Sequence, residues 1–286
     1  MIKVKWLVER YNRDRALNYL IKEIKVQGFE CTVVKYVPFQ TGKYDIYDDN
    51  DCVVFYGSLN LARQLQKEKS WIPGVYCNFK NFECITYYSH WGKYLLNQDY
   101  IMMPLMEFLR NRKNIYDNFG VVDKDYVFIR PNSGSKTFNG EVYSFEELDV
   151  EINTISQYGG LSLDQILIVV SSPKKIYREW RVVVADRKPI TASQYKVLDY
   201  IQYEKGCDNE VWRLAQEIAK ENWQPDKVYV LDICSWLNEK SNKKEYSLLE
   251  VNSFSCSGLY QCDISSVVRN ISKLAKKEWL EYQDLN

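Results

Sequence analysis

The sequence lacks the residue patterns of several common kinds of active site. It has 286 residues but a single histidine, and its eight cysteines include no C-x-x-C pair, so ligand spacing gives no support for a zinc site. The spacing G-x-x-x-x-G-K-[ST] is absent, which excludes a P-loop. No Ser–His–Asp or Cys–His constellation is found, which argues against catalysis by a protein nucleophile.

Net charge and long hydrophobic runs are missing as well. The 38 basic and 38 acidic residues cancel, so no global field attracts nucleic acid or a membrane, although a local basic patch remains possible. No run approaches the roughly 20 apolar residues of a membrane span. The N-terminus has no apolar signal-peptide core. Together with cysteines placed in apolar, strand-like runs, these features lead us to expect a reducing cytoplasm.

The composition that is present is that of a globular protein. Hydrophobic residues make up 46% and charged residues 27%, and the length suits one large or two medium domains. The order strand, helix, strand, strand, helix over residues 2–66 predicts a small open α/β unit with a parallel sheet. Gly57 and Ser58 precede the last of these helices, where they fit either an N-cap turn or an anion-binding loop. The polar residues 111–120 are the predicted linker.

A basic segment follows this linker. Residues 126–129 predict a strand that leads into Arg130 and a loop of small residues with Gly134 and Lys136. Such a loop can fold over a phosphate with its backbone N–H groups, or it can be a flexible connection between two strands. The capping-box pattern at residues 144–147 predicts the start of a helix.

Two predicted strands late in the chain carry polar side chains at positions that a core strand would fill with apolar residues. Asp232 interrupts the first strand, and Glu250 and Asn252 lie two apart on the second. Residues two apart in a strand point to the same face, and pairing of the strands would add Asp232 to that face. Three oxygen donors suit a hard cation such as Mg²⁺. A surface hairpin with its acids facing water fits the same pattern. By the same alternation, Glu179 and Arg181 share a face of the strand predicted over residues 176–185.

From residue 126 onward, these segments resemble the ATP-grasp superfamily of carboxylate–amine ligases. The matching segments are, in chain order, VFIRPNSGSKTFNG, QILIVV, REWRVVV, VLDIC and LLEVN. The chain is most similar to a phage- and bacteria-associated clade, which itself resembles the ligase that adds glutamate to a ribosomal protein. The resemblance implies an α/β (α+β) ATP-grasp fold in which two α+β lobes hold ATP between them. It places a small open parallel α/β N-terminal domain at residues 1–115 and the nucleotide-binding, catalytic domain at residues 116–286.

The resemblance also implies the roles of individual residues. Glu179 matches the acid that binds the ribose hydroxyls, and Arg181 matches a basic residue aimed at the γ-phosphate or the acyl-phosphate. The implied catalytic residues are Arg130, Lys136 and Arg181. The implied nucleotide-binding residues are Arg130, Gly134, Lys136, Val169, Val170, Ser171, Glu179 and Lys196. The implied ligands of Mg²⁺, with two ions expected, are Asp232, Glu250 and Asn252.

The sequence therefore predicts an ATP- and Mg²⁺-dependent ligase that forms a C–N bond through an acyl-phosphate and releases ADP. Its carboxylate and amine substrates are expected to be a peptide, a protein or an amino acid, with no membrane partner and, if the chain is phage-encoded, in the host cytoplasm. A phosphotransferase or a nucleic-acid-docked modifying enzyme with the same nucleotide site are the alternatives. The 23 Tyr and 8 Trp suit stacking on bases, but the zero net charge makes nucleic acid the weakest of these partners. We expect Glu250→Gln or Asp232→Asn to abolish metal-dependent ATP turnover and to leave the fold intact.

Overall fold

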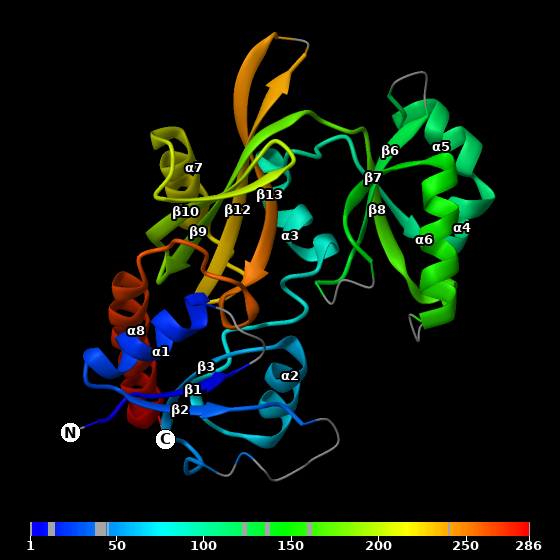
Figure 1. The fold of residues 1–286 in the computed structure, drawn as a ribbon. Helices are drawn as coiled ribbons and strands as arrows, with labels where there is room; N and C mark the ends of the chain where they lie inside the picture. The colour runs from blue at the N-terminus through cyan, green and yellow to red at the C-terminus, as the bar shows by residue number, and fades with distance from the viewer. Residues whose placement is uncertain are drawn as a thin grey trace. The chain divides into compact units, whose positions relative to one another are not determined.

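The computed structural model (Figure 1) describes residues 2–10, 15–37, 44, 46–121, 125–134, 138–158, 162–239 and 241–285. These residues form two compact units, each of which combines separate stretches of the chain. The first unit contains residues 1–78, 178–234 and 250–286, and the second contains residues 79–177 and 235–249. The division into domains at residues 115 and 116 stays a prediction. In the described part of the chain, no helix combines the length and the apolar character that crossing a membrane requires.

A four-stranded parallel sheet makes up one part of the first unit. Its strands, in the order β2-β1-β3-β4, are β1 (Lys5–Glu9), β2 (Glu30–Val34), β3 (Cys52–Tyr56) and β4 (Ile72–Gly74). Helices α1 (Arg15–Val26) and α2 (Leu59–Glu68) connect the strands. This arrangement confirms the predicted parallel α/β unit. Ser58 is the N-cap of α2 and its side chain accepts a hydrogen bond from the Leu61 N–H at 3.3 Å, which confirms the N-cap reading of that turn.

A five-stranded sheet contains the two strands on which metal ligands are predicted. Its order is β11-β10-β9-β12-β13, with strands β9 (Ile176–Ala185), β10 (Lys188–Val197), β11 (Tyr200–Lys205), β12 (Val228–Asn238) and β13 (Lys243–Ser253). Residues 178–185 of β9, 228–234 of β12 and 250–253 of β13 belong to the first unit. Helix α7 (Asn209–Lys220) packs against β10, and the short helix η3 (Phe254–Cys256) and helix α8 (Ile264–Leu285) follow β13.

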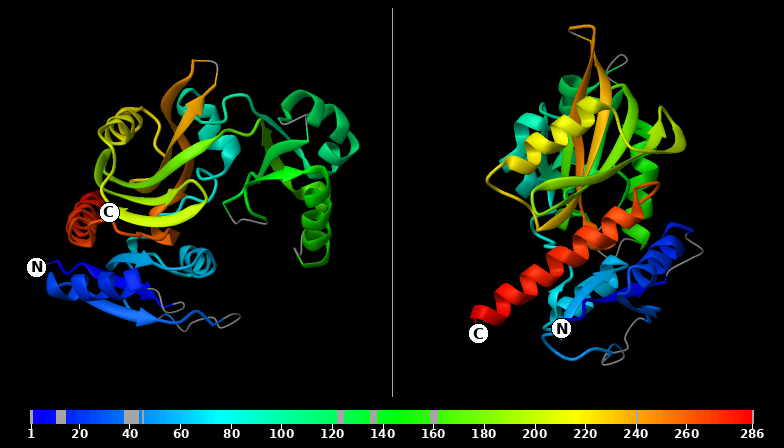
Figure 2. Two further views of the ribbon diagram at one scale, coloured as in Figure 1. Left: turned by 45° about the horizontal axis from the view of Figure 1, so that its top comes forward. Right: turned by 90° about the vertical axis from the view of Figure 1, so that its left-hand side faces the viewer.

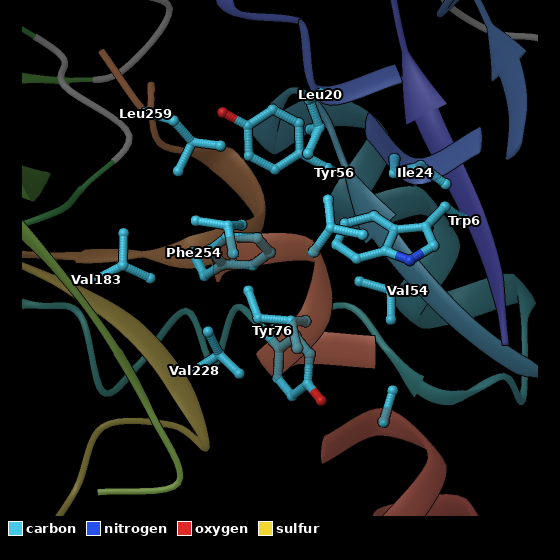
Figure 3. Close-up of a cluster of buried hydrophobic side chains, with 14 of the residues drawn as sticks. Trp6, Leu20, Ile24, Val54, Tyr56, Tyr76, Val183, Val228, Phe254 and Leu259 are labelled. Atoms are coloured by element: carbon cyan, nitrogen blue, oxygen red, sulfur yellow. The ribbon is translucent and has the colours of Figure 1, made fainter. Parts of the chain in front are cut away.

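One apolar core joins the two sheets of the first unit. Helices α1 and α8 lie between the parallel sheet and strands β9 and β12 (Figures 1 and 2). Trp6 of β1 and Val228 of β12 contribute to the same cluster, with Phe254 between them (Figure 3). Phe254 also packs on the rings of Tyr56 and Tyr76, at centroid distances of 5.6 and 6.4 Å. Each large apolar side chain buried in this way stabilises the fold by about 1.5–3 kcal/mol. This core therefore holds the strands of the candidate site firmly in position.

The second unit is built on a four-stranded antiparallel sheet. Its strands, in the order β5-β8-β6-β7, are β5 (Ile101–Pro104), β6 (Tyr126–Pro131), β7 (Glu141–Ser144) and β8 (Leu167–Ser171). Its helices are α3 (Cys84–Trp91), α4 (Leu105–Arg110), α5 (Arg112–Phe119) and α6 (Phe145–Tyr158), with the 3-10 turns η1 (Gly92–Tyr94) and η2 (Leu163–Gln165). Helices α4, α5 and α6 cover one face of the sheet with a shared apolar core.

Two predictions for the second unit have different outcomes. The predicted linker at residues 111–120 is wrong, because helix α5 fills that segment and buries Ile115 and Tyr116 in the core. Its polar composition reflects the exposed face of an amphipathic helix. The capping box is confirmed: the Ser144 hydroxyl accepts from the Glu147 N–H at 3.2 Å, and the Glu147 carboxylate accepts from the Ser144 N–H at 2.8 Å.

Candidate nucleotide and metal site

Arg181 and Asp232 form a buried ion pair between the neighbouring strands β9 and β12. The Nε of Arg181 donates to Oδ1 of Asp232 at 2.8 Å, and its Nη2 donates to Oδ2 at 2.7 Å. Its Nη1 donates to the carbonyl of Gly258 at 2.9 Å. Burial alone would lower the pKa of Arg181, but the facing Asp232 carboxylate raises it well above its usual range. The pair is therefore fixed in its charged, bidentate form.

Asn252 of β13 completes this group from the next strand. Its Nδ2 donates to Oδ2 of Asp232 at 3.0 Å, so the structure brings together two of the three predicted metal ligands. Glu250 lies two residues earlier on β13, half-buried and on the same face by strand alternation. The described residues contain no group of three or more His, Cys, Asp or Glu side chains arranged to hold a metal. The predicted set is not of that kind, because Asn252 contributes an amide in place of a carboxylate.

The donor set nevertheless fits a hard cation. Because Asn252 turns its amide nitrogen toward Asp232, its amide oxygen is left for another partner. Asp232 already accepts three hydrogen bonds, out of about four lone-pair positions of a carboxylate. Glu250, the Asn252 oxygen and one Asp232 position are thus the oxygen donors that a Mg²⁺ ion would use.

Glu179 is held by two consecutive residues of β10. The Tyr195 hydroxyl donates to Oε2 of Glu179 at 2.5 Å, and Nζ of Lys196 lies 3.4 Å from Oε1. Consecutive strand residues normally point to opposite faces, but the pairing of β9 with β10 shifts between Gln194 and Lys196. This irregularity brings both side chains to one carboxylate. The structure therefore brings Glu179 and Lys196, both predicted to bind nucleotide, into contact.

A stack of tyrosines borders the ion pair. The ring of Tyr260 stacks on Tyr195 at 4.9 Å and on Tyr203 at 5.3 Å, and the Arg181 guanidinium lies 4.7 Å from its centroid. Tyr260 has a φ of 48°, a left-handed conformation that is uncommon for an aromatic residue and is often found at functional sites. Sequence reasoning missed Tyr195, Tyr203, Gly258 and Tyr260. No local pattern distinguishes these positions, because the irregular pairing and the turn after η3 bring them together.

The remaining predicted nucleotide-binding residues lie in the second unit. Arg130 of β6 pairs with Val169 of β8, and Phe128 pairs with Ser171. Val170 joins the core on the opposite face of the sheet, so alternation places only Val169 and Ser171 on the face of Arg130. The Ser171 hydroxyl is fully buried and has no hydrogen-bond partner in the described part of the chain, so a water molecule or a ligand would satisfy it.

The loop after Arg130 is only partly described. A Cβ added to Gly140 would come within 2.9 Å of the Arg130 Cβ, so the backbone at Gly140 lies directly against Arg130. Gly134 is described, whereas Lys136 lies outside the described residues. The phosphate-binding roles of Gly134 and Lys136 stay predictions.

The adenine-binding backbone was predicted at Val169, Val170 and Ser171. Strand β8 lies between β5 and β6 and pairs with both through Val169 and Val170, so the ladder already uses the backbone groups of these two residues. Residues 172–175, directly after β8, belong to no strand. Of these, the Ser172 N–H donates to Asp99 at 3.4 Å and the Lys175 carbonyl accepts from the Leu237 N–H at 3.2 Å, and the adenine-binding role of Val169, Val170 and Ser171 stays a prediction.

Comparison with known proteins identifies the family of this arrangement. A model of the ATP-grasp domain, R-2-K clade family 2, matches residues 110–270. No curated protein sequence matches the chain significantly. Similar solved structures include a RimK domain ATP-grasp protein from Sphaerobacter thermophilus, which is 11% identical with a TM-score of 0.62, over 95% of this chain and 99% of that one. They also include D-alanine–D-alanine ligase from Bacillus anthracis complexed with ATP, at 12% identity and a TM-score of 0.61, over 99% and 100% of the two chains.

A third similar protein is the ATP-grasp ligase PsnB. Its complex with precursor peptide PsnA2 and AMPPNP is 12% identical with a TM-score of 0.55, over 96% of this chain and 98% of that one. Its complex with a minimal precursor, Mg and ADP is 13% identical with a TM-score of 0.54, over 96% and 100%. At these identities the likenesses show the fold, which is the ATP-grasp fold expected from the sequence.

Proposed function

We propose that this chain, which belongs to family 2 of the R-2-K clade of ATP-grasp domains, is an ATP-dependent, ADP-forming ligase that joins a carboxylate to an amine. The observation that carries the proposal is the grouping of charged side chains and one amide side chain on four neighbouring strands of one sheet. Glu179 and Lys196 form one contact pair, and Arg181, Asp232 and Asn252 form a second group beside it. The tyrosine stack links the two, because Arg181 lies over the rings of both Tyr195 and Tyr260.

In this proposal the two groups bind different parts of ATP. Glu179, oriented by Tyr195 and Lys196, accepts hydrogen bonds from the ribose hydroxyls. Glu250, Asn252 and Asp232 would hold Mg²⁺, and we propose two ions because a triphosphate carries enough negative charge to attract both. When bound, Mg²⁺ offsets the negative charge of the phosphate oxygens. Arg130 and Lys136 contact the phosphates, and Arg130 can do so bidentately.

The chemistry proposed for this site needs no protein nucleophile. A substrate carboxylate oxygen attacks the γ-phosphorus of ATP, which releases ADP and leaves an acyl-phosphate. An amine then attacks the activated carbonyl carbon, loses a proton, and expels inorganic phosphate. Most of the catalysis of such a phosphoryl transfer comes from the positioning of the reactants and from fixed positive charge. Two N–H groups of Arg181 remain beyond the three that the fold uses, and they would face the transferring phosphoryl group.

The proposed substrates are a peptide, a protein or an amino acid. This class is supported by two neighbours of the same fold, one a ligase complexed with a precursor peptide and the other a D-alanine–D-alanine ligase.

The test uses the full chain with ATP, Mg²⁺ and pools of carboxylates and amines that include short peptides. A ligase releases ADP and phosphate only when both a carboxylate and an amine are present, and mass spectrometry identifies the condensed product. A carboxylate labelled with ¹⁸O should transfer one label to the released phosphate. ADP release with a stable phosphorylated product and no amine requirement would instead identify a phosphotransferase. Absence of ATP binding in a calorimetric titration would refute both activities.

A further inference from the structure

A separate pocket of about 630 Å³ lies within the first unit, at the amino ends of strands β1 and β2. Residues 2–4 and 28–30 line it on one side, and helix α8 lines it on the other. Its volume lies in the range of small-molecule sites, about 300–1,000 Å³. The pocket shares no residue with the candidate nucleotide site, so its occupancy is a separate question from the proposed ligase activity.

The lining of this pocket is strongly basic although the chain as a whole has no net charge. Glu30 is the one acid of the lining, against four cationic side chains: Lys3, Arg269, Lys273 and Lys276. Three of the cations come from α8 at spacings of four and three residues, which places them on one face of the helix. Like charges at this spacing destabilise a helix slightly, so a bound anion would relieve the repulsion.

Lys277, the next residue of helix α8, differs from these four cations because it forms ion pairs. Lys277 lies 3.5 Å from a carboxylate oxygen of Asp186 and 3.9 Å from one of Glu281. Within the described ranges, no ion pair is formed by any of the four cations of the pocket. Arg269 donates to the Ser265 hydroxyl at 3.3 Å. The pKa of Glu23 is lowered chiefly by the hydrogen bond that it accepts from Gln27, and the charge of Arg269 adds a smaller effect without a direct ion pair.

The floor of the pocket is apolar and closely packed. Ser272 is buried and its hydroxyl accepts a hydrogen bond from the Trp6 indole N–H at 3.0 Å. Val4 is buried, and the half-buried Phe29 packs against the same core. Gly28 has a φ of 81°, and a Cβ there would meet no atom within 4 Å, so open space lies above this turn. A cationic rim over an apolar floor suits a ligand with one charged end and one flat, apolar end.

We propose that this pocket binds a small organic polyanion with at least two phosphate groups and a flat ring system, of which a nucleoside diphosphate is the simplest case. Arg269 to Lys276 spans about 10 Å along the helix, which is more than a single phosphate can contact. Each phosphate oxygen within reach of a lysine or arginine gains a charge-assisted hydrogen bond. The Phe29 side chain offers an aromatic surface to the ring system. Binding here is proposed in addition to nucleotide binding at the candidate site.

The test is photolabelling of the full chain with 8-azido-ADP, followed by mass-spectrometric mapping of the labelled peptides. This readout separates the pocket from the candidate site by position in the sequence. We expect label in the peptides around Phe29 and in α8, reduced at least tenfold in the Lys273→Glu/Lys276→Glu double variant. Lys277→Glu, a charge reversal on the same helix outside the pocket, is the matched control and should keep the label.

The outcomes of this experiment decide the proposal. Label confined to other peptides, or equal pocket labelling in the double variant and the control, overturns it. Binding of a single-stranded oligonucleotide that depends on Lys273 and Lys276, without ADP labelling of the pocket, assigns the surface to nucleic acid and also overturns it. Circular dichroism and the unliganded Tm establish that the variants fold. Lys273→Gln/Lys276→Gln replaces the double variant if the charge reversal prevents folding.

Discussion

Arg181 and Asp232 are joined by two hydrogen bonds of 2.8 and 2.7 Å, and both side chains are more than nine-tenths buried. The family resemblance implies that Arg181 faces a phosphate and that Asp232 binds a metal ion, and it makes no prediction about a contact between them. In the structure each is the main partner of the other. The pair therefore contributes to the fold of the sheet as well as to the proposed site.

This contact changes the expected effect of Asp232→Asn. The substitution leaves the buried Arg181 guanidinium without a compensating charge, which typically costs about 3–5 kcal/mol. We expect a lower Tm together with lost ATP turnover, instead of lost turnover in an intact fold. Thermal unfolding of both proteins measures this, and an unchanged Tm would show that the pair is not important for stability.

Glu250→Gln should separate catalysis from stability. Glu250 is half-buried near the end of β13, and glutamine keeps its shape while removing the charge that attracts Mg²⁺. We expect Mg²⁺-dependent ATP turnover to fall about 100-fold or more, while the fold stays intact. Normal turnover in this variant would mean that the proposed metal ligands are wrong.

Gly57→Ala tests the close packing at the end of β3. An added Cβ would lie 2.6 Å from the Glu9 Cβ and 2.7 Å from its carboxylate, whose oxygen accepts from the Ser58 N–H. We expect a loss of about 1–3 kcal/mol from overpacking, measured by chemical denaturation. Gly92→Ala is the matched control, since its Cβ meets nothing within 4 Å, and it should leave stability unchanged or slightly raised.

The pH dependence of stability should carry the signature of Asp226. Burial raises its pKa to about 7, although the N–H groups of Lys227 and Asn78 donate to it and act in the opposite direction. In the unfolded chain its pKa is about 4. Its contribution to stability is therefore fully present below about pH 4 and is lost as the pH rises toward 7.

Asp226→Asn removes this titration. We expect the wild type to lose Tm relative to the variant as the pH rises from 5 to 8, with the nearby Glu278 titrating in both proteins. Thermal scans at several pH values make the comparison. A difference in Tm that stays constant across this range would show that Asp226 titrates normally.

Local patterns predicted most of the elements, because the apolar spacing of a strand or helix and the residues of a helix cap are recognised from residues close in sequence. The capping box before α6 and the parallel unit built from β1, β2 and β3 are examples. The prediction failed at helix α5, where polar composition concealed two buried residues, Ile115 and Tyr116. Composition cannot reveal which face of a short helix meets a core that residues far away in the chain supply.

The sequence by itself determined the family, and it predicted the acidic and basic residues of the candidate site, since strand alternation places Glu179 with Arg181 and Glu250 with Asn252. Only the tertiary structure decided how these residues are paired. The shifted pairing between β9 and β10 brings Tyr195 and Lys196 to Glu179. The neighbouring positions of β9 and β12 bring Arg181 to Asp232. Such contacts depend on strand order and register, which are set by packing between residues that lie far apart in the chain. Arg181 and Asp232, for example, are about 50 positions apart.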